Sequence, residues 1–448
     1  RQLTEATFAM TFAKVTVFLF VFLALLIVWM VLSSYGHRNY PRDPNGSQTT
    51  PDFVVQVDDF GQFWDPEAAD RALRAIEEAA NETNTVVVLF VHGWHHNAAP
   101  EDENLRKFAR SVQEVRATLD DNPDGQPGPY RQARQQLTED GRLNVLGIYV
   151  GWRGRSLPSF LDYMTFWGRK AAAERVGNGD LREFIARIQS LYTARCEARH
   201  TGKTRTFMGF VSIGHSFGGQ ALFRAVAGQF EQELIEQTTP ASCAHVSHVP
   251  GQAGVKGVGD LVILVNPALE ALQFERLHTL GRQLGYAPAQ TPRLLVLSSK
   301  GDQARQFFFP IGRWVDTLLR PSFRGGQRAL WTEALGEYGP QRTHNLKLAE
   351  NDTILLPGFD PAVYTQTPAA IAKLDLTNLQ SIAGVALQPT GNHRPYQPFL
   401  VAYTEQKIVK DHSQVFEQSL RRLLTDYVAL LQGKRMVTEC AHQSPDGA

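Results

Sequence analysis

Residues 207–230 read FMGFVSIGHSFGGQALFRAVAGQF. The opening segment, FMGFVSI, is a continuous apolar run of strand length, which is typical of a strand buried on both faces of a parallel sheet. The closing segment, QALFRAVAGQF, has the composition of a helix. Between them, GHSFGG is a glycine-rich segment that suits a tight turn. The stretch therefore predicts a strand, a tight turn and a helix, with Ser216 at the turn.

The same kind of apolar run recurs along the chain. It appears as TVVVLFV at 85–91 and again at 143–150, 261–265 and 294–298, and a first strand is expected at 53–57. Segments with helical periodicity lie between several of these runs, among them 103–119, and a last helix is expected at 414–431. Strands that alternate with helices predict an α/β fold with a mostly parallel, doubly wound sheet.

Two long stretches interrupt this pattern, 152–206 and 303–398. Each is longer than an ordinary loop, so we expect helical, lid-type insertions that cover or build a site.

Composition narrows the class of protein. The chain has 448 residues, 43% of them apolar and 20% charged, which excludes a disordered or collagen-like chain. Its 45 basic and 45 acidic residues give no net charge, which argues against a nucleic-acid partner. Cys196, Cys243 and Cys440 contain no CxxC pair, so a zinc knuckle or disulfide framework is not expected. One disulfide remains possible, which leaves the compartment open.

The N-terminal region predicts a single membrane anchor. Residues 15–32 read VTVFLFVFLALLIVWMVL, without a charge, and a helix of that length spans about 27 Å. We expect a transmembrane helix at 12–34, although a cleaved signal and a buried core helix are alternatives. Basic residues flank both ends, so the side of the membrane is open. A polar linker at 35–52, a globular domain at 53–432 and a frayed polar tail at 433–448 complete the predicted organisation.

Two motifs indicate a family. Gly214-His215-Ser216-Phe217-Gly218 is a G-x-S-x-G pattern in its strand-turn-helix setting, and His92-Gly93-Trp94 directly follows the strand at 85–91. In this the chain resembles the α/β-hydrolase superfamily of serine esterases and lipases. The resemblance implies that Ser216 is the nucleophile and that the backbone N–H groups of Trp94 and Phe217 form the oxyanion hole.

The family's order of nucleophile, acid and base implies the other two members of a triad. Asp302 lies just past the strand at 294–298, and His412 lies just before the last helix. Glu270 is an alternative acid, because some members carry the acid one strand earlier. His393 and His344 compete with His412 for the base. A serine hydroxyl needs such a base, and the base needs a carboxylate that holds its tautomer.

Aromatic residues in the two insertions predict the substrate class. Trp152, Phe166 and Trp167 belong to the first insertion and Phe308 to the second, and His215 adjoins the nucleophile. An apolar pocket beside a serine site suits lipid or other hydrophobic esters, although a soluble ester fits almost as well. A peptidase, thioesterase or acyltransferase on the same fold, or a non-catalytic binding protein, are the alternatives.

A metal site is not expected. The histidines of HGWHHNA, His92, His95 and His96, lack carboxylate or cysteine neighbours at ligand spacing. We therefore predict a hydrolase that uses neither a metal nor another cofactor. The oligomeric state is left open.

Overall fold

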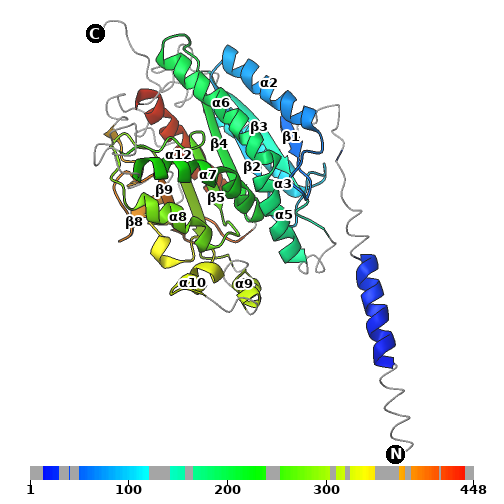
Figure 1. The fold of residues 1–448 in the computed structure, drawn as a ribbon. Helices are drawn as coiled ribbons and strands as arrows, with labels where there is room; N and C mark the ends of the chain where they lie inside the picture. The colour runs from blue at the N-terminus through cyan, green and yellow to red at the C-terminus, as the bar shows by residue number, and fades with distance from the viewer. Residues whose placement is uncertain are drawn as a thin grey trace, which may run out of the picture.

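The computed structural model describes most of the chain (Figure 1). The described residues are 14–29, 40, 50–120, 142–156, 165–238, 253–302, 309–317, 323–348, 373–378, 385–412 and 415–438.

Nine strands of the described chain form one sheet, in the order β1-β3-β2-β4-β5-β6-β9-β7-β8. All neighbouring strands pair in parallel except β7 and β8, which are antiparallel. The α/β class and the mostly parallel sheet predicted from the apolar runs are therefore confirmed. The strands are β1 (Phe53–Gln56), β2 (Thr85–Val91), β3 (Asn144–Gly151), β4 (Met208–His215), β5 (Leu261–Val265), β6 (Leu294–Ser299), β7 (His344–Leu348), β8 (Val385–Pro389) and β9 (Phe399–Thr404).

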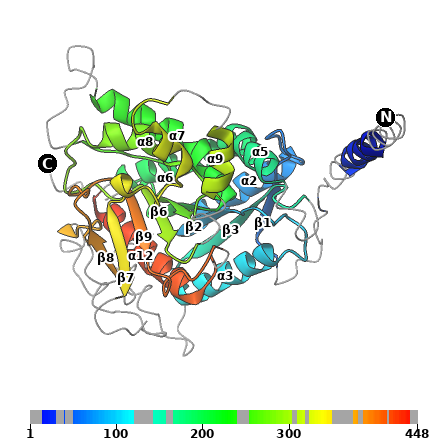
Figure 2. The ribbon, with the colours of Figure 1, turned by 90° about the horizontal axis from the view of Figure 1, so that it is seen from below.

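Helices cover both faces of the sheet, as Figure 2 shows in an edge-on view. One face carries α2 (Pro66–Glu82), α5 (Phe166–Asn178), α6 (Asp180–His200), α7 (Phe217–Thr238) and α8 (Ala271–Gly281). The other carries α3 (Glu103–Asp120) and α12 (Gln418–Thr438). Each face has its own hydrophobic core. The central strands are buried on both sides, which explains why their sequences are continuous rather than alternating apolar runs.

The parallel sheet brings distant parts of the chain to one edge. The chain leaves β2 at His92, β4 at Ser216 and β6 shortly before Asp302, all at the carboxyl ends of the strands. His412 follows β9, the next parallel strand in the sheet. Open α/β sheets place their sites at this edge, so the topology alone gathers these residues.

The first of the two long insertions forms regular structure in its described part. Residues 165–200 form α5 and α6, which connect β3 to β4 and pack against α7. The start of α5 reaches the carboxyl edge of the sheet, whereas α6 belongs to the helical layer.

The second insertion adds both helices and strands. It contains α9 (Phe309–Thr317), α10 (Gln327–Thr332) and a 3-10 turn, η3 (Gly339–Gln341). It also contributes β7 and β8, which extend the sheet beyond β9. This insertion therefore widens the sheet as well as crossing its carboxyl edge.

The C-terminal helix is longer than the sequence pattern predicts. The expected frayed tail from residue 433 is wrong for residues 433–438, because α12 continues to Thr438. Lys434 is buried and donates hydrogen bonds to the carbonyls of Leu374 and Pro288. Arg435 is buried in an ion pair with Asp260. A polar composition predicts exposure, but here buried acceptors satisfy the long cationic side chains.

The predicted anchor lies partly outside the described residues. Residues 14–29 are helical, and most of their side chains are exposed. Among the helices of the described chain, none is both long and apolar enough to cross a membrane. Residues 12–13 and 30–34 of the predicted span are not described.

One disulfide is present. Cys196, on α6, is disulfide-bonded. Cys243 and Cys440 lie outside the described residues.

Candidate active site

Ser216 occupies a strained turn between β4 and α7. Its φ angle is 55°, in the left-handed region that residues other than glycine rarely adopt. The turn packs closely on the chain beside it, because a Cβ atom added at Gly218 would lie 2.2 Å from the carbonyl oxygen of Val91. The Ser216 N–H donates to the carbonyl of Val265, and its own carbonyl accepts from Ala268. The strand-turn-helix geometry predicted from the sequence is therefore present.

The three residues that the sequence predicts as a triad lie in one hydrogen-bonded chain. The Nε2 atom of His412 is 2.7 Å from the Ser216 hydroxyl, and its Nδ1 atom is 2.7 Å from an Asp302 carboxylate oxygen. Asp302 is fully buried, whereas the His412 side chain is 24% exposed. A carboxylate only accepts hydrogen bonds, so it fixes the proton on Nδ1. Nε2 is then free to accept the serine proton.

Glu270, the alternative acid, forms ion pairs away from His412. Its carboxylate is buried and lies 3.0 Å from the Lys170 ammonium and 2.8 Å from Arg313 Nε. It also accepts a hydrogen bond from Gln273. Lys170 comes from α5 and Arg313 from α9, so Glu270 joins the two insertions. Its contacts are those of a structural ion pair, and Asp302 is the carboxylate that contacts His412.

The two rival bases lie away from this chain of hydrogen bonds. His344 is buried, and its Nε2 atom is 2.7 Å from the carbonyl oxygen of Thr377. His393 contacts the Thr377 hydroxyl at 3.1 Å. Burial lowers the pKa of both rings, that of His344 to about 4. Of the three predicted candidates, His412 is the one that contacts Ser216.

The loop that follows β2, residues 92–97 and here called the His92 loop, passes directly beside Ser216. A Cβ atom added at Gly93 would lie 2.9 Å from the Ser216 Cβ atom, so only glycine permits this approach. Trp94 follows, and its ring lies 5.7 Å from that of Phe217. Phe217 begins α7, where the first N–H groups lack partners within the helix. The two predicted oxyanion donors thus belong to segments that meet at Ser216.

A buried imidazole supports the His92 loop from behind. The ring of His92 stacks between Tyr149 and Trp152, with ring centroids at 5.3 and 5.6 Å. The Trp152 N–H donates to His92 Nε2 at 3.0 Å, so Nδ1 carries the proton and donates to the Gly93 carbonyl at 2.8 Å. Burial lowers the pKa of His92 to about 4, which keeps the ring neutral near pH 7.

Trp152 was expected to line a substrate pocket, and the structure places it elsewhere. It is 3% exposed, and its indole N–H donates to the His92 carbonyl at 2.7 Å. Trp152 therefore lies behind the His92 loop as part of its support. Both of its donors are used by His92, which an aromatic-rich sequence segment does not reveal.

The other three aromatic residues predicted for the pocket differ in where they lie. Phe166 contacts both Trp94 and Phe217, with ring centroids at 5.6 and 5.3 Å, and so borders the serine turn. Trp167, beside it, is 49% exposed. Phe308 lies outside the described residues, but the adjacent Phe309 contacts Phe166 at 6.4 Å. The two insertions therefore contact each other through the rings of Phe166 and Phe309.

His215 was also expected at the pocket. Its ring is buried, and its Nε2 atom lies 2.6 Å from the carbonyl oxygen of His412. A carbonyl only accepts, so Nε2 carries the proton. Burial, reinforced by the neighbouring His412, lowers the pKa of His215 to about 3. The ring is therefore a neutral donor to the loop that carries His412.

The remaining histidines of HGWHHNA serve the local structure. His96 contacts the Asp102 carboxylate at 3.3 Å, and His95 stacks on Trp94. Burial favours a higher pKa for Asp102, but the hydrogen bond and charge of His96 outweigh it and lower that pKa. Within the described ranges, no group of three or more metal-ligating side chains occurs.

Sequence reasoning missed two buried residues at the same edge of the sheet. Asn266 follows β5 directly with a φ of 45°, and Ser299 ends β6. The Asn266 side chain donates to the carbonyl of Asp411, and the Ser299 hydroxyl donates to that of Val409. The sequence signal that could have identified both residues is a polar side chain at the carboxyl end of an apolar strand.

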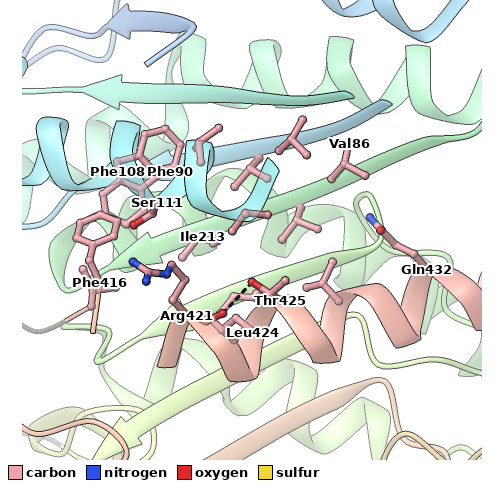
Figure 3. Close-up of a pocket in the computed structure, with 18 residues that line it drawn as sticks. Val86, Phe90, Phe108, Ser111, Ile213, Phe416, Arg421, Leu424, Thr425 and Gln432 are labelled. Carbon is pink, nitrogen blue, oxygen red and sulfur yellow. Dashed lines mark hydrogen bonds between the residues drawn. The ribbon is translucent and has the colours of Figure 1, made fainter. Parts of the chain in front are cut away.

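A separate cavity of about 110 Å³ lies between α3, α12 and the sheet (Figure 3). Phe90, Phe108 and Phe416 lie at one end of it, and Gln432 lies at the other. Arg421, on its wall, pairs with Glu114. The lining is almost wholly apolar and offers no group for chemistry. Phe416, shortly after His412, packs against Phe90 beside this cavity, with ring centroids at 5.0 Å.

Comparisons of the chain with family models, with curated proteins and with solved structures found no match. The chemistry of the site therefore rests on its own residues. Those residues supply a hydroxyl, a base that contacts it and a buried carboxylate that contacts the base.

Proposed function

We propose that the chain is a serine hydrolase of the α/β-hydrolase type that cleaves carboxylic esters. The observation that carries this proposal is the chain of two 2.7 Å hydrogen bonds from Ser216 through His412 to Asp302. The strained φ of Ser216 and its place between β4 and α7 support it, because a nucleophile elbow needs both.

The proposed reaction proceeds through an acyl-enzyme. His412 Nε2 takes the Ser216 proton while the serine oxygen attacks the ester carbonyl carbon. The backbone N–H groups of Trp94 and Phe217 stabilise the oxyanion. The imidazolium then gives its proton to the leaving alkoxide. A water molecule, deprotonated by the same base, then attacks the acyl carbon. The bond to the serine oxygen breaks, the imidazolium returns its proton to that oxygen, and the acid leaves.

The aromatic surroundings of Ser216 favour a hydrophobic acyl group. Trp94, Phe166, Phe217 and Phe309 contribute neighbouring rings from the His92 loop, α5, the serine turn and α9. Apolar walls with few polar groups bind lipid-like substrates. We therefore propose lipase, phospholipase or esterase activity on hydrophobic esters.

A membrane location follows from the apolar N-terminal run as part of the proposal. We propose that residues 12–34 form a single-pass anchor. Tyr40 is bonded to the domain, because its backbone N–H and carbonyl each form a 3.0 Å hydrogen bond with the Gln56 side chain. The chain from the end of this anchor at residue 34 to residue 40 spans at most about 22 Å. The active site would then stay near the bilayer surface, where hydrophobic esters concentrate.

The disulfide of Cys196 indicates on which side of the membrane the domain lies. Disulfides persist in oxidising compartments and are rare in the cytosol. We therefore propose that the domain faces away from the cytosol. A cysteine-alkylation assay on membranes, with and without reductant, tests this: full alkylation without reductant would contradict it.

The activity is tested with p-nitrophenyl esters from acetate to palmitate and the detergent-solubilised full chain. Ser216→Ala and His412→Ala should abolish turnover, and a fluorophosphonate probe should label Ser216 only in the wild type. Rates that rise with acyl length would support the lipid substrate, whereas an acetate optimum would favour a soluble ester. An inert wild type that resists the probe would reject the hydrolase and favour a binding role.

A matched test of the acyl site uses Phe166→Ala. Removing this ring should lower kcat/KM for a long-chain ester by about tenfold and leave that for the acetate nearly unchanged. Equal losses on both esters would contradict an acyl-binding role for Phe166.

A further inference from the structure

The segment that carries His412, residues 405–412 and here called the His412 loop, is neither helix nor strand. Three carbonyl groups of this loop accept hydrogen bonds from buried side chains of neighbouring strand ends. We infer that His215, Asn266 and Ser299 are positioning residues that hold the His412 imidazole against Ser216. This inference rests on the proposed hydrolase function. The three residues are called the carbonyl clamp below.

His215 joins the nucleophile and the base through one side chain. It is the last residue of β4 and directly precedes Ser216. Its Nε2–H donates to the carbonyl of His412 at 2.6 Å. Its Nδ1 atom has no hydrogen-bond partner among the described residues. The one hydrogen bond that this buried ring forms is therefore to His412, the proposed base.

Asn266 supplies the second contact from the next strand. Its side-chain N–H group donates to the carbonyl of Asp411 at 3.2 Å, and its side-chain oxygen accepts the Ser299 N–H at 2.9 Å. Its φ of 45° directs the chain sharply away from β5. Asparagine tolerates that conformation better than most residues. Asn266 thus links the end of β6 to the His412 loop.

Ser299 supplies the third contact and also bears on Asp302. Its hydroxyl donates to the carbonyl of Val409 and accepts the Gly301 N–H. The Asp302 N–H donates to the carbonyl of Ser299. A Cβ atom added at Gly301 would lie 2.0 Å from the carbonyl oxygen of Lys410, so the Asp302 and His412 segments touch. Ser299 therefore fixes the acid and the base relative to each other.

The placement of these bonds favours positioning over general stability. The donors lie at the carboxyl ends of β4, β5 and β6, which are adjacent in the sheet, and β4 and β6 also lead to Ser216 and Asp302. The acceptors lie at or just before His412. A loop that is hydrogen-bonded at these three points keeps the His412 imidazole within hydrogen-bond distance of both Ser216 and Asp302. A displacement of about 1 Å at a catalytic group costs on the order of a hundredfold in rate.

The first test compares two substitutions of similar size at His215. His215→Met removes the donor, whereas His215→Gln retains an N–H at about the reach of Nε2. We expect His215→Met to lower kcat by about a hundredfold with KM within about twofold, and His215→Gln to recover much of the loss. Equal rates for the two variants and the wild type would overturn the role of His215.

The second test uses neighbouring serines of β6. Ser299→Ala removes the contact with Val409, whereas Ser298→Ala removes a buried hydrogen bond to the Leu335 carbonyl instead. Both should lower the melting temperature, but only Ser299→Ala should lower kcat. Asn266→Gly removes the amide without straining the backbone and should lower kcat as well. Equal kcat losses for both serine variants would show that Ser299 contributes only general packing, and would contradict its positioning role.

A spectroscopic readout separates this inference from the proposed function. The proton shared by His412 and Asp302 should give a low-field NMR resonance in the full chain in detergent. His215→Met and Asn266→Gly should shift or abolish that resonance, and Ser298→Ala should preserve it. If no ester is hydrolysed and no probe binds, yet the clamp variants lose the resonance, the hydrolase proposal fails and the positioning role stands. An unchanged resonance in every clamp variant would overturn the clamp.

Discussion

The His92 loop and the His412 loop both contact the Ser216 turn, and they are held in different ways. The His92 loop combines stacked rings, with His92 between Tyr149 and Trp152, with the close approach of Gly93 and two hydrogen bonds from Trp152. The His412 loop is tied through its carbonyls to three strand ends. Packing fixes how closely a backbone approaches, whereas directional hydrogen bonds fix where a side chain points.

The difference matches the two tasks proposed for these loops. An oxyanion donor is a backbone N–H, so a rigid backbone beside Ser216 suffices. A general base must aim one ring nitrogen at a hydroxyl and the other at a carboxylate. We therefore expect the two loops to respond differently to substitution, and the following changes test that from the largest effect to the smallest.

The largest effect is expected at the acid behind the His412 loop. Asp302→Asn should lower kcat by about four orders of magnitude, because the amide favours the wrong tautomer of His412. Glu270→Gln should leave the proposed activity of the folded protein unchanged. It should instead destabilise the fold by about 3 to 5 kcal/mol, because Lys170 and Arg313 lose their buried partner. The test is to measure kcat and urea unfolding for both variants. A loss of kcat in Glu270→Gln, with kcat retained in Asp302→Asn, would make Glu270 the acid.

A smaller loss is expected when the His92 loop is pushed away from the serine. Gly93→Ala places a methyl group 2.9 Å from both the Ser216 Cβ and the His215 Nδ1 atoms. We expect kcat to fall by about 10² to 10³, the effect of losing one oxyanion donor. Fluorophosphonate labelling rates provide a second measurement. Wild-type rates in this variant would show that the Trp94 N–H is not an oxyanion donor.

Loss of the supporting imidazole should affect stability more than rate. His92→Phe keeps a stacked ring but removes the ring's hydrogen bonds with the Trp152 backbone N–H and the Gly93 carbonyl. Leaving those buried groups unpaired should cost about 1 to 3 kcal/mol of unfolding free energy. We expect kcat to change by about tenfold or less, since stacking persists. A loss as large as that of Gly93→Ala would mean that the hydrogen bonds, and not the packing, set the loop.

The mildest effect is the pH dependence of stability. Burial lowers the pKa of His92 to about 4, of His215 to about 3 and of His344 to about 4. Unfolded histidines titrate near 6.5, so the unfolded chain binds more protons as pH falls. Stability should therefore decline from about pH 6.5 down to about pH 4, by about 1.4 kcal/mol per pH unit for each group. Urea unfolding at several pH values measures the slope of the unfolding free energy against pH. His92→Phe should lower that slope by the contribution of one histidine.

Much of the fold could be predicted from local sequence. The structure has β2 and β5 at the predicted residues, because long apolar runs between turns are legible without tertiary information. The C-terminal helix was less well predicted, since it begins at Gln418 and continues to Thr438. Its end depends on the Asp260 carboxylate that holds Arg435, and no local pattern contains that partner.

The sequence by itself determined the strand at 85–91, the strained turn at Ser216 and the order in which Asp302 and His412 follow it. Chain-local propensities and the needs of a tight turn suffice for these features. The residues around them were decided only by the tertiary structure. Glu270 became the partner of cations from two separate helices, and Trp152 the support of a loop that lies far from it in sequence.

The carbonyl clamp belongs to the second group for the same physical reason. A hydrogen bond between Asn266 and Asp411, or between Ser299 and Val409, joins residues more than a hundred positions apart. The types and spacing of residues along the chain do not specify such pairs. They arise because a parallel sheet brings the ends of its strands to one edge, where each buried carbonyl must find a donor.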